Sequence, residues 1–300
     1  MVIQVKDFSK SFGKQKAVDN LNFVVNQGEI FGFLGRNGAG KTTTFRTLIG
    51  LYQADEGELL IQGHPFDDSL RNQIGYMPEE RGLYTRATVM DVLLYMGRLR
   101  GLEKAEALSS SQKWLKRLKL EGHEKKRIQQ LSSGMQQKVQ IIVTLMHKPS
   151  ILILDEPFRG LDPVNRQLVY DCMQELKRDG FTILFSSHEI HEVEQFCDRV
   201  ILMADGQAKA YGKVEDIRRA YADRFLSLTI LSGEIGEHEG IEWKRVHGNT
   251  VEIRYKEDTD PQSLIRDLML NARIKRFEIA EPSLNDVFLQ LCGDEVVVDE

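Results

Sequence analysis

The stretch that decides the fold is the octapeptide at residues 35–42, Gly35-Arg36-Asn37-Gly38-Ala39-Gly40-Lys41-Thr42, which fits the pattern GxxxxGK[ST]. Its glycines let the backbone curl so that several N–H groups point inward at an anion. A short apolar run, Ile30–Leu34, precedes it, and Lys41–Leu51 has the apolar spacing of a helix. A strand before and a helix after are the context in which this pattern binds phosphate. We therefore predict a nucleotide-phosphate loop rather than a Gly-rich turn that matches by chance.

Each residue type in this phosphate loop has a part in the prediction. The helix that follows presents the positive end of its dipole to the phosphates, Lys41 reaches the β- and γ-phosphates, and the Thr42 hydroxyl ligates Mg²⁺. The residues expected to bind the nucleotide here are Gly35, Asn37, Gly38, Ala39, Gly40, Lys41, Thr42 and Thr43.

A second candidate site follows the apolar run Ile151–Leu154, where the chain continues with Asp155 and Glu156. In open α/β sheets, ligands bind at the carboxyl ends of the strands. Asp155 is placed to hold Mg²⁺, and Glu156, which leaves the strand in another direction, is placed to polarise an attacking water. Alone, such an acidic pair is most often the start of a solvated loop. Together with the phosphate loop, it favours a metal and water site.

The composition indicates a soluble globular chain in a reducing compartment. Of the 300 residues, 28% are charged and 41% hydrophobic, and the formal net charge is −5. The longest apolar runs fall far short of the roughly 20 residues that span a membrane, and the N-terminal residues lack the pattern of a secretory signal. Three widely separated cysteines argue against a disulfide framework or a zinc site. No basic patch is large enough to indicate nucleic-acid binding.

Strand-like and helical segments alternate up to about residue 220, which predicts an α/β domain with a largely parallel sheet. The first thirty residues predict an antiparallel β region, and residues 86–147 a mainly helical block inserted into the domain. Residues 221–300 hold 9 basic and 17 acidic side chains, and this change of charge suggests a boundary near residue 220. We expect one domain at 1–220 and a small α+β domain at 221–300, with strands near 226–231, 251–255 and 274–279 and helices near 262–270 and 284–291.

Three further segments complete a recognisable order. Leu131-Ser132-Ser133-Gly134-Met135-Gln136-Gln137, called here the signature segment, precedes the carboxylates, Gly160-Leu161-Asp162 follows them, and Ser187-His188-Glu189 comes later. With the phosphate loop, residues 2–215 resemble an ABC transporter ATP-binding subunit, which implies a P-loop NTPase core of the ABC type. The tail at residues 281–289, Glu-Pro-Ser-Leu-Asn-Asp-Val-Phe-Leu, resembles the C-terminal extension of bacterial ABC export ATPases of the sodium- and drug-efflux type.

The resemblance implies an ATPase that binds ATP with Mg²⁺, and it implies roles for several further residues. Phe12 would stack on adenine, with Val18 packing nearby, although an aromatic residue in a hairpin more often belongs to a core. Ser132 and Gly134 would contact the γ-phosphate of a nucleotide held by a partner subunit. The start of a helix at this point agrees with that role, because its free N–H groups favour an anion.

Further implied roles concern catalysis and the metal. Asp162 would organise the dimer interface and the attacking water. His188 would contact the γ-phosphate and hold Glu156 or the water in line, so Glu156 and His188 are the expected catalytic residues. The sequence departs from the family pattern at two sites: Glu79 stands where Gln is common, and the signature, usually LSGGQ, reads Leu131-Ser132-Ser133-Gly134-Met135 here. Since a carboxylate can still ligate Mg²⁺, the expected metal ligands are Thr42, Glu79 and Asp155.

The family pattern also implies partners. One phosphate loop and one signature segment per chain imply a head-to-tail dimer around two ATP molecules, formed by two copies or by this chain and another ABC ATPase. A membrane-spanning permease on a separate chain would be driven by closure of that dimer, which places this subunit on the cytoplasmic face of the membrane. The tail favours export over import. We expect the permease to dock on Glu79–Thr85 together with Val92, Tyr95 and Met96.

Two other functions are weighed against this one. Soluble ABC ATPases also work in translation or DNA maintenance, but those chains usually carry two cassettes or long coiled-coil insertions, and this sequence has neither. A P-loop kinase would share the phosphate loop, but the signature segment and His188 argue against it.

Overall fold

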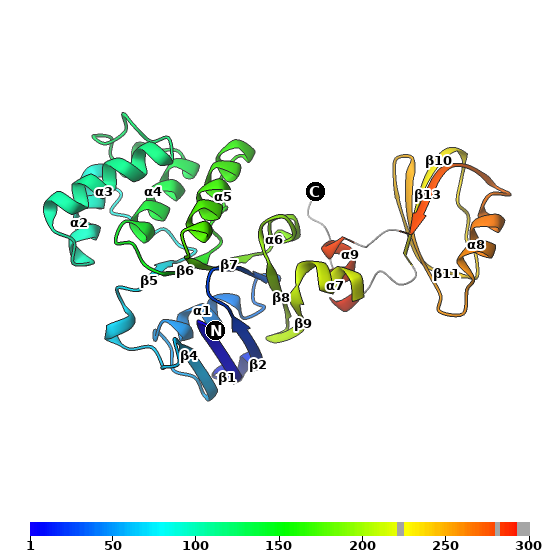
Figure 1. Cartoon of the computed structure of the whole chain (residues 1–300), viewed down its shortest axis with the longest axis horizontal. Coiled ribbons are helices and arrows are strands. Elements are labelled where there is room, and N and C mark those ends of the chain that lie inside the picture. The colour runs from blue at the N-terminus through cyan, green and yellow to red at the C-terminus, as the bar shows by residue number, and fades with distance from the viewer. Residues whose placement is uncertain (221–224, 280–282, 293–300) are drawn as a thin grey trace. The chain divides into compact units, whose positions relative to one another are not determined.

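The computed structural model describes residues 1–220, 225–279 and 283–292 (Figure 1). It divides the chain into two compact units, Met1–Gly212 and Lys213–Glu300. This boundary comes before the one that charge suggests near residue 220, because helix α7 (Val214–Ala220) belongs to the second unit. Within the described ranges, no helix is both long enough and apolar enough to cross a lipid bilayer.

A six-stranded sheet forms the centre of the first unit. Its strands are β3 (Ile30–Leu34), β5 (Ile74–Met77), β6 (Ile151–Asp155), β7 (Thr182–Ser187), β8 (Arg199–Ala204) and β9 (Gln207–Lys213). They lie in the order β5-β6-β7-β3-β8-β9, and the pairs β5–β6, β6–β7, β7–β3 and β3–β8 are parallel. Every residue of β3 and β6 is buried, which is why both segments are continuous apolar runs in the sequence.

The order of the strands brings the candidate residues together. The phosphate loop follows β3, Asp155 and Glu156 end or follow β6, and His188 follows β7. Since β6, β7 and β3 are parallel neighbours, their carboxyl ends meet at one edge of the sheet, where open α/β sheets bind ligands. Helices that pack on these strands are α1 (Lys41–Leu48), α5 (Pro163–Arg178) and α6 (Ile190–Phe196).

The predicted helical block is confirmed. It contains α2 (Val89–Leu99), α3 (Lys104–Arg117) and α4 (Ser133–Leu145), which pack on one another (Figure 1). The short 3-10 helix η2 (Ile128–Gln130) lies between α3 and α4 in the sequence, and η1 (Asp68–Leu70) precedes β5. Thr88 and Ser132 begin α2 and α4 by accepting a hydrogen bond from a first-turn backbone N–H. Gly97 lets α2 approach α3, because a Cβ there would lie 3.0 Å from the Cβ of Ala107.

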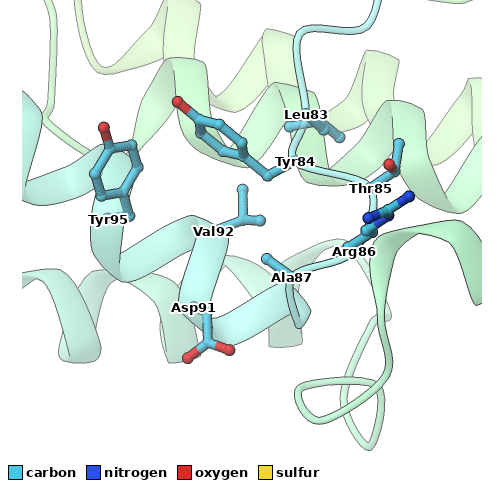
Figure 2. Close-up of a pocket in the computed structure, with 8 residues that line it drawn as sticks. All are labelled: Leu83, Tyr84, Thr85, Arg86, Ala87, Asp91, Val92 and Tyr95. Carbon is cyan, nitrogen blue, oxygen red and sulfur yellow. The ribbon is translucent and has the colours of Figure 1, made fainter.

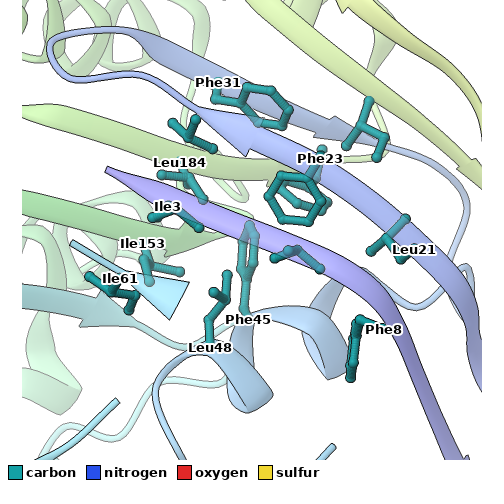
Figure 3. Packing of buried hydrophobic residues seen from close by; sticks show 14 of the residues in the cluster. Ile3, Phe8, Leu21, Phe23, Phe31, Phe45, Leu48, Ile61, Ile153 and Leu184 are labelled. Atoms are coloured by element: carbon teal, nitrogen blue, oxygen red, sulfur yellow. The ribbon is translucent and has the colours of Figure 1, made fainter. Parts of the chain in front are cut away.

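An antiparallel sheet covers the N-terminal part of the first unit, as predicted. Its strands are β1 (Ile3–Phe12), β2 (Gln15–Val25) and β4 (Glu56–Ile61), in the order β2-β1-β4. Between this sheet and the parallel sheet lies a buried cluster that includes Ile3, Phe23 and Phe31 (Figure 3). Phe45 of α1 joins the cluster, with its ring centroid 4.9 Å from that of Phe33. This packing anchors the helix that carries the end of the phosphate loop.

The second unit has the α+β composition expected of the tail. A four-stranded antiparallel sheet in the order β11-β12-β10-β13 packs one face against α8 through residues such as Leu264 and Leu268, and α7 and α9 contact each other. The elements after α7 are β10 (Phe225–Gly233), β11 (Ile241–His247), β12 (Thr250–Tyr255), α8 (Pro261–Leu268), β13 (Ala272–Ile279) and α9 (Leu284–Cys292). The strand β11 is not among those expected from the sequence.

Candidate active site

Close approach of neighbouring strands explains two glycines of the phosphate loop. A Cβ at Gly35 would lie 2.4 Å from the Met203 carbonyl oxygen, and one at Gly40 would lie 2.6 Å from the Ala17 carbonyl oxygen. Gly40 also has a left-handed backbone, with φ of 100°, where it begins α1, and side chains rarely tolerate that conformation. The other predicted loop residues, which are Asn37, Gly38, Ala39, Thr42 and Thr43, lie in the loop and the first turn of α1.

Lys41, the first residue of α1, is buried over the loop. Its Nζ donates hydrogen bonds to the carbonyl oxygens of Gly35 (2.6 Å) and Arg36 (3.2 Å), and it lies 3.9 Å from Oε1 of Glu156. Burial lowers the pKa of Lys41, and the carboxylates of Glu156 and Asp155 oppose that shift. The ammonium group therefore lies between the loop and the carboxylates at the end of β6.

Asp155 is fully buried at the end of β6. Ser186 of β7 donates a hydrogen bond of 2.5 Å to its Oδ1. Burial raises the pKa of Asp155, and the hydroxyl groups of Ser186 and Thr42 oppose that shift. Because a neighbouring strand and the helix after the loop both supply hydroxyl groups here, the carboxylate faces the phosphate loop.

Glu156 is also buried, and its backbone has a φ of 51°, the left-handed region. Its Oε2 lies 2.9 Å from Nδ1 of His188. Within the described part of the chain, Glu156 Oε1 and Asp155 Oδ2 are buried and make no hydrogen bond. A buried oxygen without a partner costs about 1–3 kcal/mol, and carboxylate oxygens are the ligands that Mg²⁺ prefers. The unpartnered oxygen of Asp155 therefore fits a metal ion that binds next to phosphate, whereas that of Glu156 is free to accept a proton.

The pKa of His188 depends on its contact with Glu156. The hydrogen bond with Glu156 raises the pKa of His188 above the ordinary value of 6.5, and partial burial opposes the shift. The stabilisation that this pair gives the folded chain is therefore fully present below pH 6.5 and is lost as the pH rises through the raised pKa.

We expect Glu156→Gln to lower the pKa of His188, because the amide carries no charge to favour the imidazolium. The pKa is measured from the pH dependence of the histidine ring signals in NMR spectra. Glu175→Gln is the matched control, because Glu175 pairs with Arg117 outside this site and its loss is expected to leave His188 unchanged. An unchanged His188 pKa in Glu156→Gln would contradict the assignment of the shift to this pair.

A cavity of about 230 Å³ lies beside Glu156 and His188. Residues that line it come from the phosphate loop, from the segment after β5, from the segment after β6 and from the start of α6, and they include Asn37, Glu79, Glu156, Arg159, His188 and Glu192. Burial raises the pKa of Glu192 to about 7. Glu79, an expected metal ligand, makes an ion pair of 2.5 Å with Arg159 here.

The residues predicted to act at a dimer interface, Ser132, Gly134 and Asp162, do not line this cavity. Ser132 begins α4 and accepts a hydrogen bond from the Met135 backbone, and Gly134 lies in the first turn of that helix. Asp162 begins α5 in the same way, by accepting from the Asn165 backbone at 2.9 Å. Both helix starts leave backbone N–H groups without intrahelical partners, the arrangement that favours an anion.

Phe12 and Val18 lie on the N-terminal sheet. Phe12 is 45% exposed at the end of β1, and its ring meets that of Tyr52 edge-on with centroids 5.2 Å apart. Val18 is buried, and its side chain would be 3.0 Å from a Cβ at Gly40. Val18 thus packs directly behind the phosphate loop, while Phe12 is partly exposed with the Lys10 ammonium over its ring.

Sequence reasoning missed three residues that organise this site. Ser186 binds Asp155, Arg159 binds Glu79, and Arg81 donates a hydrogen bond of 2.6 Å to the Ser133 hydroxyl in the signature segment. The Ser133 contact gives a structural use to one departure from the LSGGQ pattern. The only sequence signal for Arg159 was a cationic residue in the segment 155–162, which also contains Asp155, Glu156 and Asp162.

Comparison with known proteins agrees with the resemblance to an ABC transporter ATP-binding subunit that the sequence motifs suggest. A family model described as ABC transporter matches residues 18–159, and a second, described as the C-terminal domain of DrrA1-3-like ATP-binding proteins, matches residues 212–292. The uncharacterized ABC transporter ATP-binding protein YhaQ of Bacillus subtilis strain 168 is 40% identical over 297 residues, which cover 97% of this chain and 99% of YhaQ. The chain belongs to the ABC transporter ATP-binding protein family. ABC ATPases hydrolyse ATP to power transport, and the predicted ATPase activity is thereby confirmed.

Further ABC relatives extend the match. Nod factor export ATP-binding protein I of Sinorhizobium fredii is 32% identical over 308 residues, which cover 99% of this chain and 87% of that protein. A solved ATP-binding subunit of an ABC transporter is 34% identical, with a TM-score of 0.68 over 74% of this chain and 93% of that chain. An ATP-binding cassette solved as a dimer in a post-hydrolysis state with ADP and Pi is 25% identical, with a TM-score of 0.64 over 70% of this chain and 98% of that chain. The ABC-type α/β fold with a C-terminal domain is therefore confirmed.

Proposed function

We propose that this ABC ATPase hydrolyses ATP at the edge of its parallel sheet to drive an export permease, with Glu156 as the general base. The observation that carries the proposal is the position of the Glu156 carboxylate. One oxygen is held by His188 at 2.9 Å, and the other is buried without a hydrogen bond in the described chain, 3.9 Å from Lys41. A base needs a fixed carboxylate with a free oxygen that faces its substrate.

The residues around Glu156 divide the remaining work. Backbone N–H groups of the phosphate loop and the Lys41 ammonium would bind the β- and γ-phosphates and offset their charge. Thr42 and Asp155 would hold Mg²⁺, which would neutralise developing negative charge on the phosphates when bound. Glu156 would accept the proton of the attacking water, and His188 would keep that carboxylate aimed at it.

A dimer would complete the site. Ser132 and Gly134 lie at the start of α4 and do not line the cavity that holds Glu156 and His188, and we propose that the signature segment of a second subunit binds the phosphates. The dimeric form of the solved cassette with ADP and Pi supports this arrangement. The second subunit would be another copy of this chain or another ABC ATPase, with Asp162 at the interface between them.

The permease would dock on an apolar hollow of about 690 Å³ in the first unit (Figure 2). Its lining residues are Leu83, Tyr84, Thr85, Arg86, Ala87, Asp91, Val92 and Tyr95. The Tyr84 and Tyr95 rings meet edge-on with centroids 5.5 Å apart, and both are about half exposed, at 54% and 48%. Exposed aromatic side chains beside a hollow are typical anchors of a protein interface.

The hollow is connected to the candidate active site through the segment after β5 and through α4. It begins at Leu83, four residues after Glu79, and Gln140 of α4 donates to the carbonyl oxygen of Pro78 at 2.7 Å. A cytoplasmic segment of the permease is therefore the occupant that we propose, with this subunit on the cytoplasmic face of the membrane. Export, rather than import, is supported by the similarity to the Nod factor export ATP-binding protein I.

Replacing Tyr84 and Tyr95 together with Ala is expected to reduce the permease that co-purifies from membranes at least about fivefold, because an interface anchor contributes about 1–2 kcal/mol or more. The permease is identified by mass spectrometry after pull-down of the tagged wild-type chain. Leu99→Ala is the matched control, since Leu99 is 64% exposed on the same helix but outside the hollow. Equal recovery of permease with the double variant and the wild type would place the docking surface elsewhere.

A further inference from the structure

Glu79 and Arg159 form an ion pair inside the cavity of the candidate active site. The Arg159 guanidinium donates to Oε1 of Glu79 at 2.5 Å, and both residues line the cavity that also contains Glu156 and His188. The two side chains come from different segments, Glu79 from the one after β5 and Arg159 from the one after β6. They are also partly open to solvent, with side-chain exposures of 36% and 61%. The pair can therefore break without burying an unpaired charge.

The backbone on both sides of the pair is held by α4. Gln137 donates to the carbonyl oxygens of Glu156 and Pro157 at 3.2 and 3.1 Å, and Gln140 donates to that of Pro78 at 2.7 Å. Both glutamines are buried. Because neighbouring main-chain positions are fixed in this way, separation of the Glu79 carboxylate from the guanidinium needs only side-chain rotations.

The charges in the cavity set up a competition for Glu79. Glu79, Asp155 and Glu156 each influence the Lys41 ammonium, so the three carboxylates lie within electrostatic range of one cation. A triphosphate adds negative charge that repels an unpaired carboxylate, whereas Mg²⁺ attracts a carboxylate oxygen. Arginine cannot ligate a metal, but its guanidinium pairs well with phosphate. Arg159 and a metal ion are thus alternative partners for the same carboxylate.

We infer that Arg159 is a positioning residue for Glu79: it neutralises and holds this carboxylate until Mg²⁺ enters with the nucleotide and takes its place. The inference rests on the proposed function, because it requires the nucleotide and metal to bind in this cavity. It explains how a carboxylate can replace the usual Gln at position 79 without excluding triphosphate. The dependence of nucleotide affinity on Mg²⁺ is then a property of the pair and not of either residue alone.

The test is a double-mutant cycle with Glu79→Gln, Arg159→Gln and the double variant, all in the full-length chain. Calorimetry measures the Kd of a slowly hydrolysed ATP analogue with Mg²⁺ and with EDTA. The readout is the affinity with Mg²⁺ divided by the affinity in EDTA. Arg159→Gln leaves Glu79 unpaired, so affinity in EDTA is expected to fall about three- to fivefold and the ratio to rise, an effect typical of one exposed charge pair. Glu79→Gln removes the carboxylate that would take the metal, so the ratio is expected to fall. The double variant is expected to match Glu79→Gln, because Arg159→Gln leaves no carboxylate unpaired once Glu79 is replaced, whereas independent effects of opposite sign would return the ratio to the wild-type value.

Arg117→Gln, which breaks an ion pair with Glu175 outside the cavity, is the control and is expected to keep the wild-type ratio. Single-variant effects that simply add in the double variant, or ratios that do not change in either single variant, would overturn the inference. Failure of the proposed function looks different, because the wild type itself would then not bind the analogue with Mg²⁺. Thermal unfolding checks that each variant is folded, and Glu79→Gln alone still tests the inference if Arg159→Gln is not.

Discussion

Replacing Glu156 with Gln is expected to lower the kcat for ATP hydrolysis by about 10²–10⁴-fold, the usual contribution of a general base. The amide has nearly the shape of the carboxylate but cannot accept the proton of the attacking water. It also removes the negative charge 3.9 Å from the Lys41 ammonium, so binding of ATP is expected to persist or to become tighter. The kcat is measured from phosphate release, and ATP binding from equilibrium titration.

The same variant is expected to accumulate as an ATP-bound dimer, because the nucleotide that bridges the two subunits is no longer cleaved. Analytical ultracentrifugation with and without Mg²⁺ and ATP detects that dimer. Glu175→Gln makes the same chemical change at a residue paired with Arg117 and is the control for turnover. Wild-type turnover in Glu156→Gln would remove Glu156 as the base, whereas lost turnover without a dimer would contradict the shared site.

Lys41→Ala is expected to act at an earlier step, on nucleotide binding itself. Removal of one partner of a buried charge pair costs about 2–5 kcal/mol, so the Kd for ATP is expected to rise roughly 30-fold or more. In the structure, the ammonium is buried and its hydrogen bonds are to the loop carbonyl oxygens of Gly35 and Arg36, so it can turn to an anion that enters the loop. Equilibrium titration with ATP measures the change.

Two comparisons make the Lys41 experiment decisive. Lys113→Ala removes an exposed lysine from α3, outside the cavity lining, and is expected to bind ATP as the wild type does. The Glu156→Gln and Lys41→Ala variants should also differ in kind, the first with retained binding and the second with weakened binding. An unchanged Kd in Lys41→Ala would mean that the phosphates do not bind in this loop.

The parts of the fold that the sequence could predict are those where one physical requirement dominates. Burial on both faces makes β3 and β6 apolar throughout, and a phosphate loop needs glycines where neighbouring strands come within contact distance. Strand β11 was missed because its sequence, Ile-Glu-Trp-Lys-Arg-Val-His, is mostly polar. It lies at the edge of its sheet, where charged side chains are common and periodicity is weak.

The candidate site was predictable to the extent that its residues lie in sequence motifs. The loop, Asp155, Glu156 and His188 follow neighbouring parallel strands, so their proximity could be inferred from strand order. The pairing of Glu79 with Arg159 could not, because it joins segments 80 residues apart through long side chains whose directions depend on the packing of α4. Contacts of this kind have no periodic signal in the sequence.

The left-handed backbone of Glu156 has a consequence for engineering of this chain. A residue other than Gly in that conformation costs about 1–2 kcal/mol, and the residues that adopt it most readily, Gly, Asn and Asp, either lack a carboxylate or have one on a shorter side chain. Selection of variants for thermal stability alone therefore favours replacement of Glu156, which raises stability but lowers the kcat for ATP hydrolysis. Libraries built on this scaffold should keep position 156 constant.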